Sequence, residues 1–186
     1  MMDLHIHSSL SDGQASVYEI LEQAEKKRLG AIAVTDHGPG HVFGATNREL
    51  RRLAGELRAL RDSCRVKVLA GVEAEVGEDG SLGLDDDIKF DIVLASIHAS
   101  AGEEDYFRRL KLALSKFRID VVAHHGLYLS SSNMKLNEEV IELMKARKVA
   151  VEINSFHRLP DLDFLSMCAQ AGIKFTTGSD AHSIER

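Results

Sequence analysis

The chain of 186 residues has no tryptophan, two prolines and two cysteines. It contains no run of the 18 or more apolar residues that a membrane-spanning helix needs. Its first residues show no basic segment followed by an apolar one, so we expect no signal peptide. Cys64 and Cys168 lie far apart and form no CxxC pair. These two features predict reduced thiols in a cytoplasmic protein without a membrane partner.

The charge balance narrows the possible partners. Lys and Arg number 23 against 29 Asp and Glu, which gives a formal net charge of -6. This acidic balance argues against a general nucleic-acid coat or a binder of anionic membranes. The length predicts one domain spanning residues 1–186. Hydrophobic residues make up 44% and charged residues 28%, as in a folded globular protein.

Short apolar segments alternate with amphipathic segments along the whole chain. Strands are expected at 3–7, 31–35, 66–76, 91–97, 120–123, 149–153 and 173–177. Apolar residues spaced three and four apart predict helices at 17–28, 48–61, 106–117, 136–145 and 162–171. This alternation predicts an α/β fold with a parallel sheet, either open or closed into a barrel. In both, ligands bind where the strands end at their carboxyl side.

Six of the nine histidines end an expected strand or follow it closely: His5, His7, His37, His98, His124 and His182. Glu73 lies within the third expected strand, and Asp180 follows the seventh. Because the strand ends converge, we expect these groups to share one pocket. A bound cation would relieve the repulsion between its carboxylates. Mixed histidine and carboxylate ligands favour Zn, Mn or Fe, and their number predicts two to three divalent ions.

In this order, the segments resemble the motifs of the PHP (polymerase and histidinol phosphatase) superfamily. They are similar in particular to the PHP domain of bacterial X-family DNA polymerases and to stand-alone YcdX-type phosphoesterases. The resemblance covers essentially the whole chain. The segments that carry it are residues 3–8, 11–13, 35–38, 71–73, His98, His124, 152–154 and 178–182.

The resemblance implies a distorted TIM-like (β/α)7 barrel with a trinuclear metal centre. The implied ligands of the first metal are His5, His7, Glu73 and Asp180, and those of the second are Glu73, His98 and His124. The third metal would be held by Asp12, His37 and His182. Asp12 is assigned by the resemblance alone, because the residues themselves indicate only a turn there. His125 directly follows His124, where family members often have proline, so either of the two could be the fifth-strand ligand.

The implied activity is that of a metal-dependent phosphoesterase. We expect it to hydrolyse a small phosphomonoester, in the manner of a histidinol phosphatase, through metal-activated water. His157 and Arg158 follow the sixth expected strand and are candidate catalytic residues that meet the substrate phosphate. One alternative is a 3'-5' exonuclease or nucleotide phosphodiesterase, which makes nucleic acid a less expected partner. Another is a catalytically inactive barrel that serves as a protein-interaction module.

Four further features have open interpretations. Glu75 shares a strand face with Glu73 and is either an orienter of a ligand or a polar rim residue. Asp36 could orient a ligand imidazole, and His41 lies in a glycine-rich loop that is a lid or a solvent-exposed loop. The helix with Arg48, Arg51, Arg52, Arg58 and Arg61 is a solvated face or a nucleic-acid contact.

Overall fold

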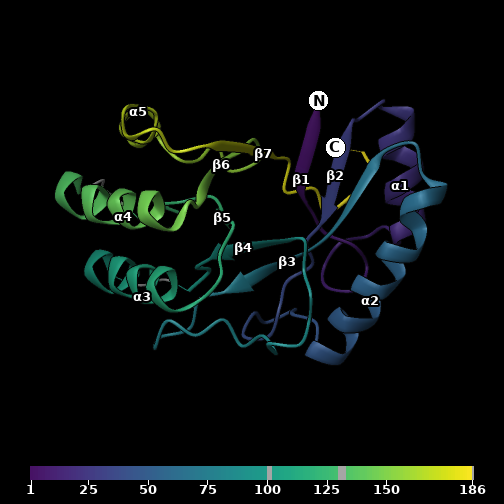
Figure 1. Ribbon diagram of the computed structural model, residues 1–186, viewed down its shortest axis with the longest axis horizontal. Coiled ribbons are helices and arrows are strands. Elements are labelled where there is room, and N and C mark those ends of the chain that lie inside the picture. The colour runs from purple at the N-terminus through teal and green to yellow at the C-terminus, as the bar shows by residue number, and fades with distance from the viewer. Residues whose placement is uncertain (100–101, 130–132, 186) are drawn as a thin grey trace.

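Seven parallel strands in the order β1 to β7 form the centre of the molecule (Figure 1). The structure is a computed structural model that describes residues 1–99, 102–129 and 133–185. The strands are β1 Met2–Ile6, β2 Ala31–Val34, β3 Lys67–Glu75, β4 Ile92–Ser96, β5 Val121–Val122, β6 Ala150–Asn154 and β7 Phe175–Gly178. The helices are α1 Val17–Lys26, α2 Asn47–Leu60, α3 Glu103–Lys116, α4 Met134–Arg147 and α5 Leu162–Ala171, with a short 3-10 turn at Arg61–Ser63.

Strand β3 joins the two halves of the sheet. Its first half, Lys67–Ala70, pairs with β2, and its second half, Gly71–Glu75, pairs with β4. The change of partner occurs at Gly71, where a Cβ atom would lie 2.6 Å from the Thr35 side chain and 2.8 Å from that of Ile92. A glycine therefore lets the sheet curve sharply at this point.

The remaining seam lies between β1 and the segment that follows β7. Asp180 N donates to His5 O at 2.9 Å, and His7 N donates to Ala181 O at 3.0 Å. These parallel contacts nearly close the sheet, which confirms the predicted TIM-like barrel. The strand ends that carry the candidate ligands are thereby brought to one mouth.

The helices begin where the sequence supplies caps. Ser16 and Glu19 form a capping box at α1, and Thr46 and Glu49 form one at α2. In Figure 1, α1 and α2 cover one side of the barrel and α3, α4 and α5 cover the other. Two apolar clusters lie beneath these two sets of helices. Among the described residues, no helix is long and apolar enough to cross a membrane.

The connection between β3 and β4 is a loop, and residues 76–91, all of which the structure describes, contain no helix. Leu82, Ile88 and Phe90 are nevertheless buried and belong to the larger apolar cluster. Strand β5 is only two residues long, but Asp120 N and Ala123 N continue its hydrogen bonds to β4. The expected strand at 120–123 is thus hydrogen-bonded to β4 as predicted, although its regular part is only two residues long.

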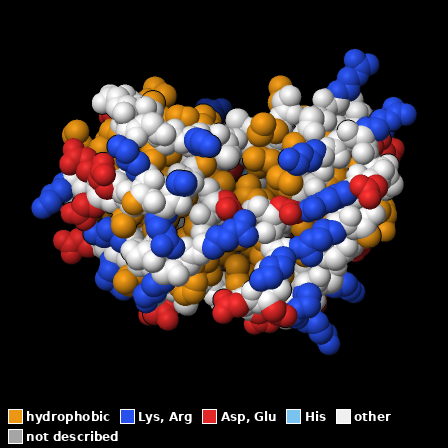
Figure 2. All heavy atoms as spheres, viewed as in Figure 1, with side chains coloured by type: hydrophobic (Ala, Val, Ile, Leu, Met, Phe, Trp, Pro, Cys, Tyr) orange, Lys and Arg blue, Asp and Glu red, His pale blue; other side chains and the backbone are white. Residues whose placement is uncertain are grey.

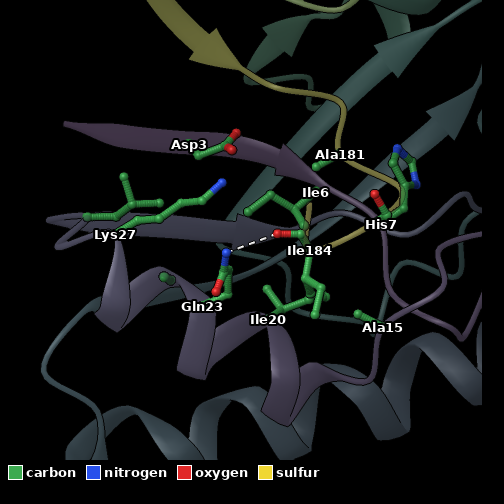
Figure 3. A pocket seen from close by; sticks show the side chains of 12 residues that line it. Asp3, Ile6, His7, Ala15, Ile20, Gln23, Lys27, Ala181 and Ile184 are labelled. Atoms are coloured by element: carbon green, nitrogen blue, oxygen red, sulfur yellow. Dashed lines mark hydrogen bonds between the residues drawn. The ribbon is translucent and has the colours of Figure 1, made fainter. Parts of the chain in front are cut away.

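Beside the seam, a small cavity of about 50 Å³ lies between β1, α1 and the last residues (Figure 3). Gln23 Nε2 donates to Ile184 O at 3.0 Å across it. The segment after β7 therefore covers the outer face of β1 beside α1. The walls of the cavity are mostly apolar and include Ile6, Ala15, Ile20, Ala24, Leu29 and Ala181.

The packing of the helices against the barrel can be tested by substitution. Leu114 of α3 is fully buried, whereas Leu162 at the start of α5 is 82% exposed. We expect Leu114→Ala to lower the free energy of unfolding by about 3 kcal/mol, because it leaves a cavity. Leu162→Ala should change it by less than about 0.5 kcal/mol. Urea denaturation of both variants measures the difference, and equal effects would contradict this packing.

Candidate metal centre

The carboxylate of Glu73 lies at the centre of the barrel mouth and is 1% exposed. Its Oε2 atom lies 3.2 Å from His5 Nε2 and 3.3 Å from His7 Nε2, both at the end of β1. The same oxygen lies 2.8 Å from His37 Nδ1, which follows β2. Side chains from three strands therefore meet at one oxygen atom.

The second oxygen of Glu73 faces the other half of the barrel. Its Oε1 atom lies 2.7 Å from His124 Nε2 and 3.4 Å from His98 Nε2. His125 is buried away from this group, and its ring stacks on Phe164 of α5 with centroids 4.0 Å apart. Of the two adjacent histidines, the structure thus brings His124 to the candidate centre.

A separate group of possible ligands surrounds Asp12. Its Oδ1 atom lies 3.3 Å from His182 Nε2 and 3.8 Å from His7 Nδ1, and its Oδ2 atom lies 3.5 Å from His37 Nε2. Among the described residues, His7 Nδ1 has no hydrogen-bond partner although it is buried. Such an atom is costly to bury. A cation between these four side chains would give its lone pair a partner, so the residues fit a metal ion.

Asp180 connects β7 to the same mouth. Its Oδ1 atom lies 3.3 Å from His7 Nε2 and 3.7 Å from His5 Nε2. Its Oδ2 atom lies 3.2 Å from His157 Nε2, so the candidate catalytic His157 reaches the centre. Arg158 is exposed in the same loop and has a left-handed backbone with φ 56°.

Charges in this pocket shift one another strongly. Burial alone would raise the pKa of the Glu73 carboxyl, but His5, His124 and His37 hold it well below its usual range. Burial disfavours the protonated form of His5, yet Glu152 and Glu73 outweigh it and raise its pKa. At His7 burial prevails and lowers the pKa. The carboxylates are thus held ionised, the state in which they bind metal.

Two carboxylates that were not among the predicted ligands orient them. Glu75 Oε2 lies 2.6 Å from His98 Nδ1, and Glu75 Oε1 accepts from His98 N at 2.9 Å. Glu152 Oε1 lies 2.7 Å from His5 Nδ1, and its Oε2 accepts from His124 N at 2.8 Å. Glu75 is therefore an orienter of a ligand. Glu152 could have been found from the sequence, because it is a carboxylate in an otherwise apolar strand.

Asp36 holds a loop and not an imidazole. Its carboxylate accepts from Ser8 N at 2.9 Å and Ser8 Oγ at 2.7 Å. It also accepts from Ser11 N at 3.2 Å and Ser11 Oγ at 2.7 Å. These bonds fix the turn that carries Asp12 opposite His182. The turn signal at residues 11–13 and the ligand assignment by resemblance are therefore compatible.

His41 lies over the mouth as part of a compact loop. Its ring stacks on that of His37 with centroids 3.7 Å apart, and its centroid lies 4.8 Å from that of His98. Gly44 is required for this turn, because a Cβ atom there would overlap the carbonyl oxygen of Gly38. His41 is therefore part of the rim and not a free surface histidine.

The arginine-rich helix α2 is largely engaged with its own chain. Arg51 pairs with Asp85 at 3.0 Å and with Asp87 at 2.7 Å, and Arg61 pairs with Asp91. Figure 2 shows Lys and Arg side chains along α2 with acidic side chains beside them. This mixture of charges favours a solvated face over a nucleic-acid contact.

Residues 3–156 match the family model of the PHP domain. The chain belongs to the PHP domain family. The resemblance that the motifs carry is therefore confirmed. The PHP domain is 33% identical over 195 residues to "DNA polymerase/3'-5' exonuclease PolX" of Bacillus subtilis. The alignment covers 98% of the chain but only 34% of that polymerase. The chain thus spans about a third of the length of this relative.

Other relatives match the PHP domain over most of their length. A "Probable phosphatase" of Caldicellulosiruptor bescii is 28% identical over 97% of the chain and 79% of its own length. The histidinol phosphate phosphatase of Lactococcus lactis, solved with zinc, L-histidinol and phosphate, has a TM-score of 0.73 at 20% identity. That match covers 100% of the chain and 87% of the solved chain, so the two share a fold.

The central carboxylate provides a test of the site. Glu73→Gln keeps the size of the side chain but removes the charge that faces five imidazoles. We expect phosphoesterase activity to fall by at least about 100-fold, the scale seen when the support of a transition-state charge is lost. Metal content by elemental analysis should also fall more than in Glu75→Gln. Near-normal turnover and metal in Glu73→Gln, with both lost in Glu75→Gln, would contradict this placement.

His125 provides a test of pH dependence. Burial lowers its pKa to about 4, whereas an unfolded histidine has a pKa of about 6.5. As the pH falls below 6.5, the unfolded chain takes up a proton that the folded chain excludes, so stability is lost down to pH 4. Between pH 7 and pH 5 we expect the wild type to lose about 2 kcal/mol more than His125→Gln. Urea titrations measure this, and parallel slopes would contradict it.

Proposed function

We propose that residues 1–186 form a single PHP domain that hydrolyses a small phosphomonoester with two or three divalent ions of Zn, Mn or Fe. The observation that carries this proposal is the convergence on one mouth of nine possible ligands, which come from the ends of six of the seven strands and from the turn at Asp12. Within it, four overlapping groups have ligand atoms within 4.8 Å of one another. These groups are His7, Asp12, His37 and His182; His5, His7 and Asp180; His5, Glu73 and His124; and His37, His41 and His98.

These groups overlap the ligand sets that the resemblance implies, except that His98 groups with His37 and His41 and not with Glu73 and His124. Glu73 would bridge two ions, because its two oxygens face different imidazoles. When bound, the ions supply a nucleophile by lowering the pKa of water, and they neutralise the charge of the phosphate oxygens. The zinc, L-histidinol and phosphate bound to the Lactococcus lactis relative support a substrate of this size and charge.

The chain itself supplies a candidate proton donor. His157 Nε2 and Asp180 Oδ2 lie 3.2 Å apart, within hydrogen-bonding distance, at the edge of the metal ligands. Burial and the nearby His124 lower the pKa of His157, whereas Asp180 raises it. We assign it the delivery of a proton to the leaving alkoxide. Arg158 follows it and would bind a phosphate oxygen from the rim.

The alternative is a 3'-5' exonuclease or a nucleotide phosphodiesterase. The match to the PolX polymerase supports it, although the chain corresponds to 34% of that protein. The net charge of -6 and the internal pairing of Arg51 and Arg61 favour the small substrate. An inactive interaction module fits poorly with a full set of nine converging ligands, since a site without function would tend to lose them.

A substrate comparison tests the proposal. Metal-free protein is supplied with Mn, Zn or Fe, and its kcat/KM is measured on phosphomonoesters, a phosphodiester and a short single-stranded DNA. We expect faster hydrolysis of a phosphomonoester, because the mouth concentrates metal ligands without a basic track for nucleic acid. Glu73→Gln serves as the inactive control. A much higher kcat/KM for degradation of the DNA from its 3' end would support the alternative.

A further inference from the structure

The side-chain amide of Asn154, the last residue of β6, makes four hydrogen bonds in the interior. Its Nδ2 atom donates to Glu152 Oε2 at 3.1 Å and to Asp180 Oδ2 at 3.2 Å. Its Oδ1 atom accepts from Phe156 N at 3.1 Å and from His157 N at 2.9 Å. The residue is 1% exposed. One amide therefore connects two buried carboxylates with the loop that carries His157.

This position requires a primary amide. An amide offers two donors and an acceptor oxygen with two lone pairs, and here all four are used. Aspartate would keep the acceptor but would place a third carboxylate against Glu152 and Asp180. Serine has a single donor, and alanine would leave the two loop N–H groups without their acceptor.

The amide also determines which way Asp180 presents its oxygens. Because Oδ2 receives Asn154 Nδ2, the other oxygen, Oδ1, is turned toward His7 and His5. The same Oδ2 lies 3.2 Å from His157 Nε2. One oxygen of the carboxylate thus serves the metal ligands, while the other is shared by the amide and His157.

The backbone of Asn154 completes the arrangement. Its N–H donates to Leu159 O at 2.8 Å, which closes the loop at its far end. The loop is therefore fixed at both ends by one residue. This arrangement holds the His157 ring above Asp180 without any direct bond between Asn154 and that ring.

We propose that Asn154 is a positioning residue that couples the metal ligand Asp180 to the proton donor His157. The inference rests on the proposed function, because the coupling matters for a reaction in which His157 protonates the leaving group. A good leaving group needs little protonation, whereas a poor one depends on it. Loss of Asn154 should therefore slow the hydrolysis of an ester with a poor leaving group more than that of an ester with a good one. A general loosening of the structure would slow both equally.

The experiment compares Asn154→Ala with the wild type on p-nitrophenyl phosphate, which has a good leaving group, and on an alkyl phosphate, which has a poor one. We expect kcat for the alkyl ester to fall at least about tenfold more than kcat for the aryl ester, with similar KM values. Asn137→Ala is the matched control. This second buried asparagine lies on α4 and contacts His125. Its loss should affect both esters equally.

A double variant distinguishes coupling between Asn154 and His157 from independent effects of the two residues. If Asn154 acts through His157, the His157→Ala, Asn154→Ala protein should hydrolyse the alkyl ester about as fast as His157→Ala alone. Additive losses, or equal losses on the two esters, would overturn the proposal.

Hydrogen exchange gives a readout that does not depend on activity. In Asn154→Ala, the amide protons of Phe156 and His157 should exchange faster, while those of β3 and β4 should keep their protection. Unchanged protection at both loop amides would overturn the positioning role. If the wild type hydrolyses neither ester with any of the metals, the proposed function fails, and the exchange result alone supports or overturns the positioning of the loop.

Discussion

The arrangement of side chains in the barrel mouth depends on a single buried anion, the carboxylate of Glu73. Burying a charge is costly unless it is paired. Five imidazoles from the ends of four other strands lie within 3.4 Å of its two oxygens. This convergence depends on β3, which pairs with β2 through its first half and with β4 through its second. A shift of one residue in that strand would turn Glu73 out of the mouth.

A second layer of polar groups holds the first one in place. Glu75 fixes the ring of His98, and Glu152 fixes that of His5. Asp36 fixes the turn of Asp12 through two serines. Histidine ligands need such partners, because the partner decides which ring nitrogen is free for a metal. The mouth is therefore preorganised by hydrogen bonds that do not themselves reach the proposed ions.

Much of this centre could be predicted from the sequence, because histidines at strand ends are a local feature. Parallel strands bring such ends together whichever way the sheet closes, so His5, His37 and His98 were found without the fold. The partners of Glu75 and Asp36 could not be found in that way. A carboxylate two residues from a ligand can face the ligand, the rim or a loop, and only the tertiary packing decides. The curvature at Gly71 depends equally on neighbours that are distant in sequence.

The same charges bear on the number of ions that we propose. Six carboxylates lie in or beside the centre: Asp12, Asp36, Glu73, Glu75, Glu152 and Asp180. With neutral imidazoles their formal charge is -6, so two divalent ions would leave -2 and three would leave the site neutral. A site at -2 repels a phosphate dianion, whereas a neutral site does not. A third ion, held by the group around Asp12, would therefore favour the binding of a phosphate substrate.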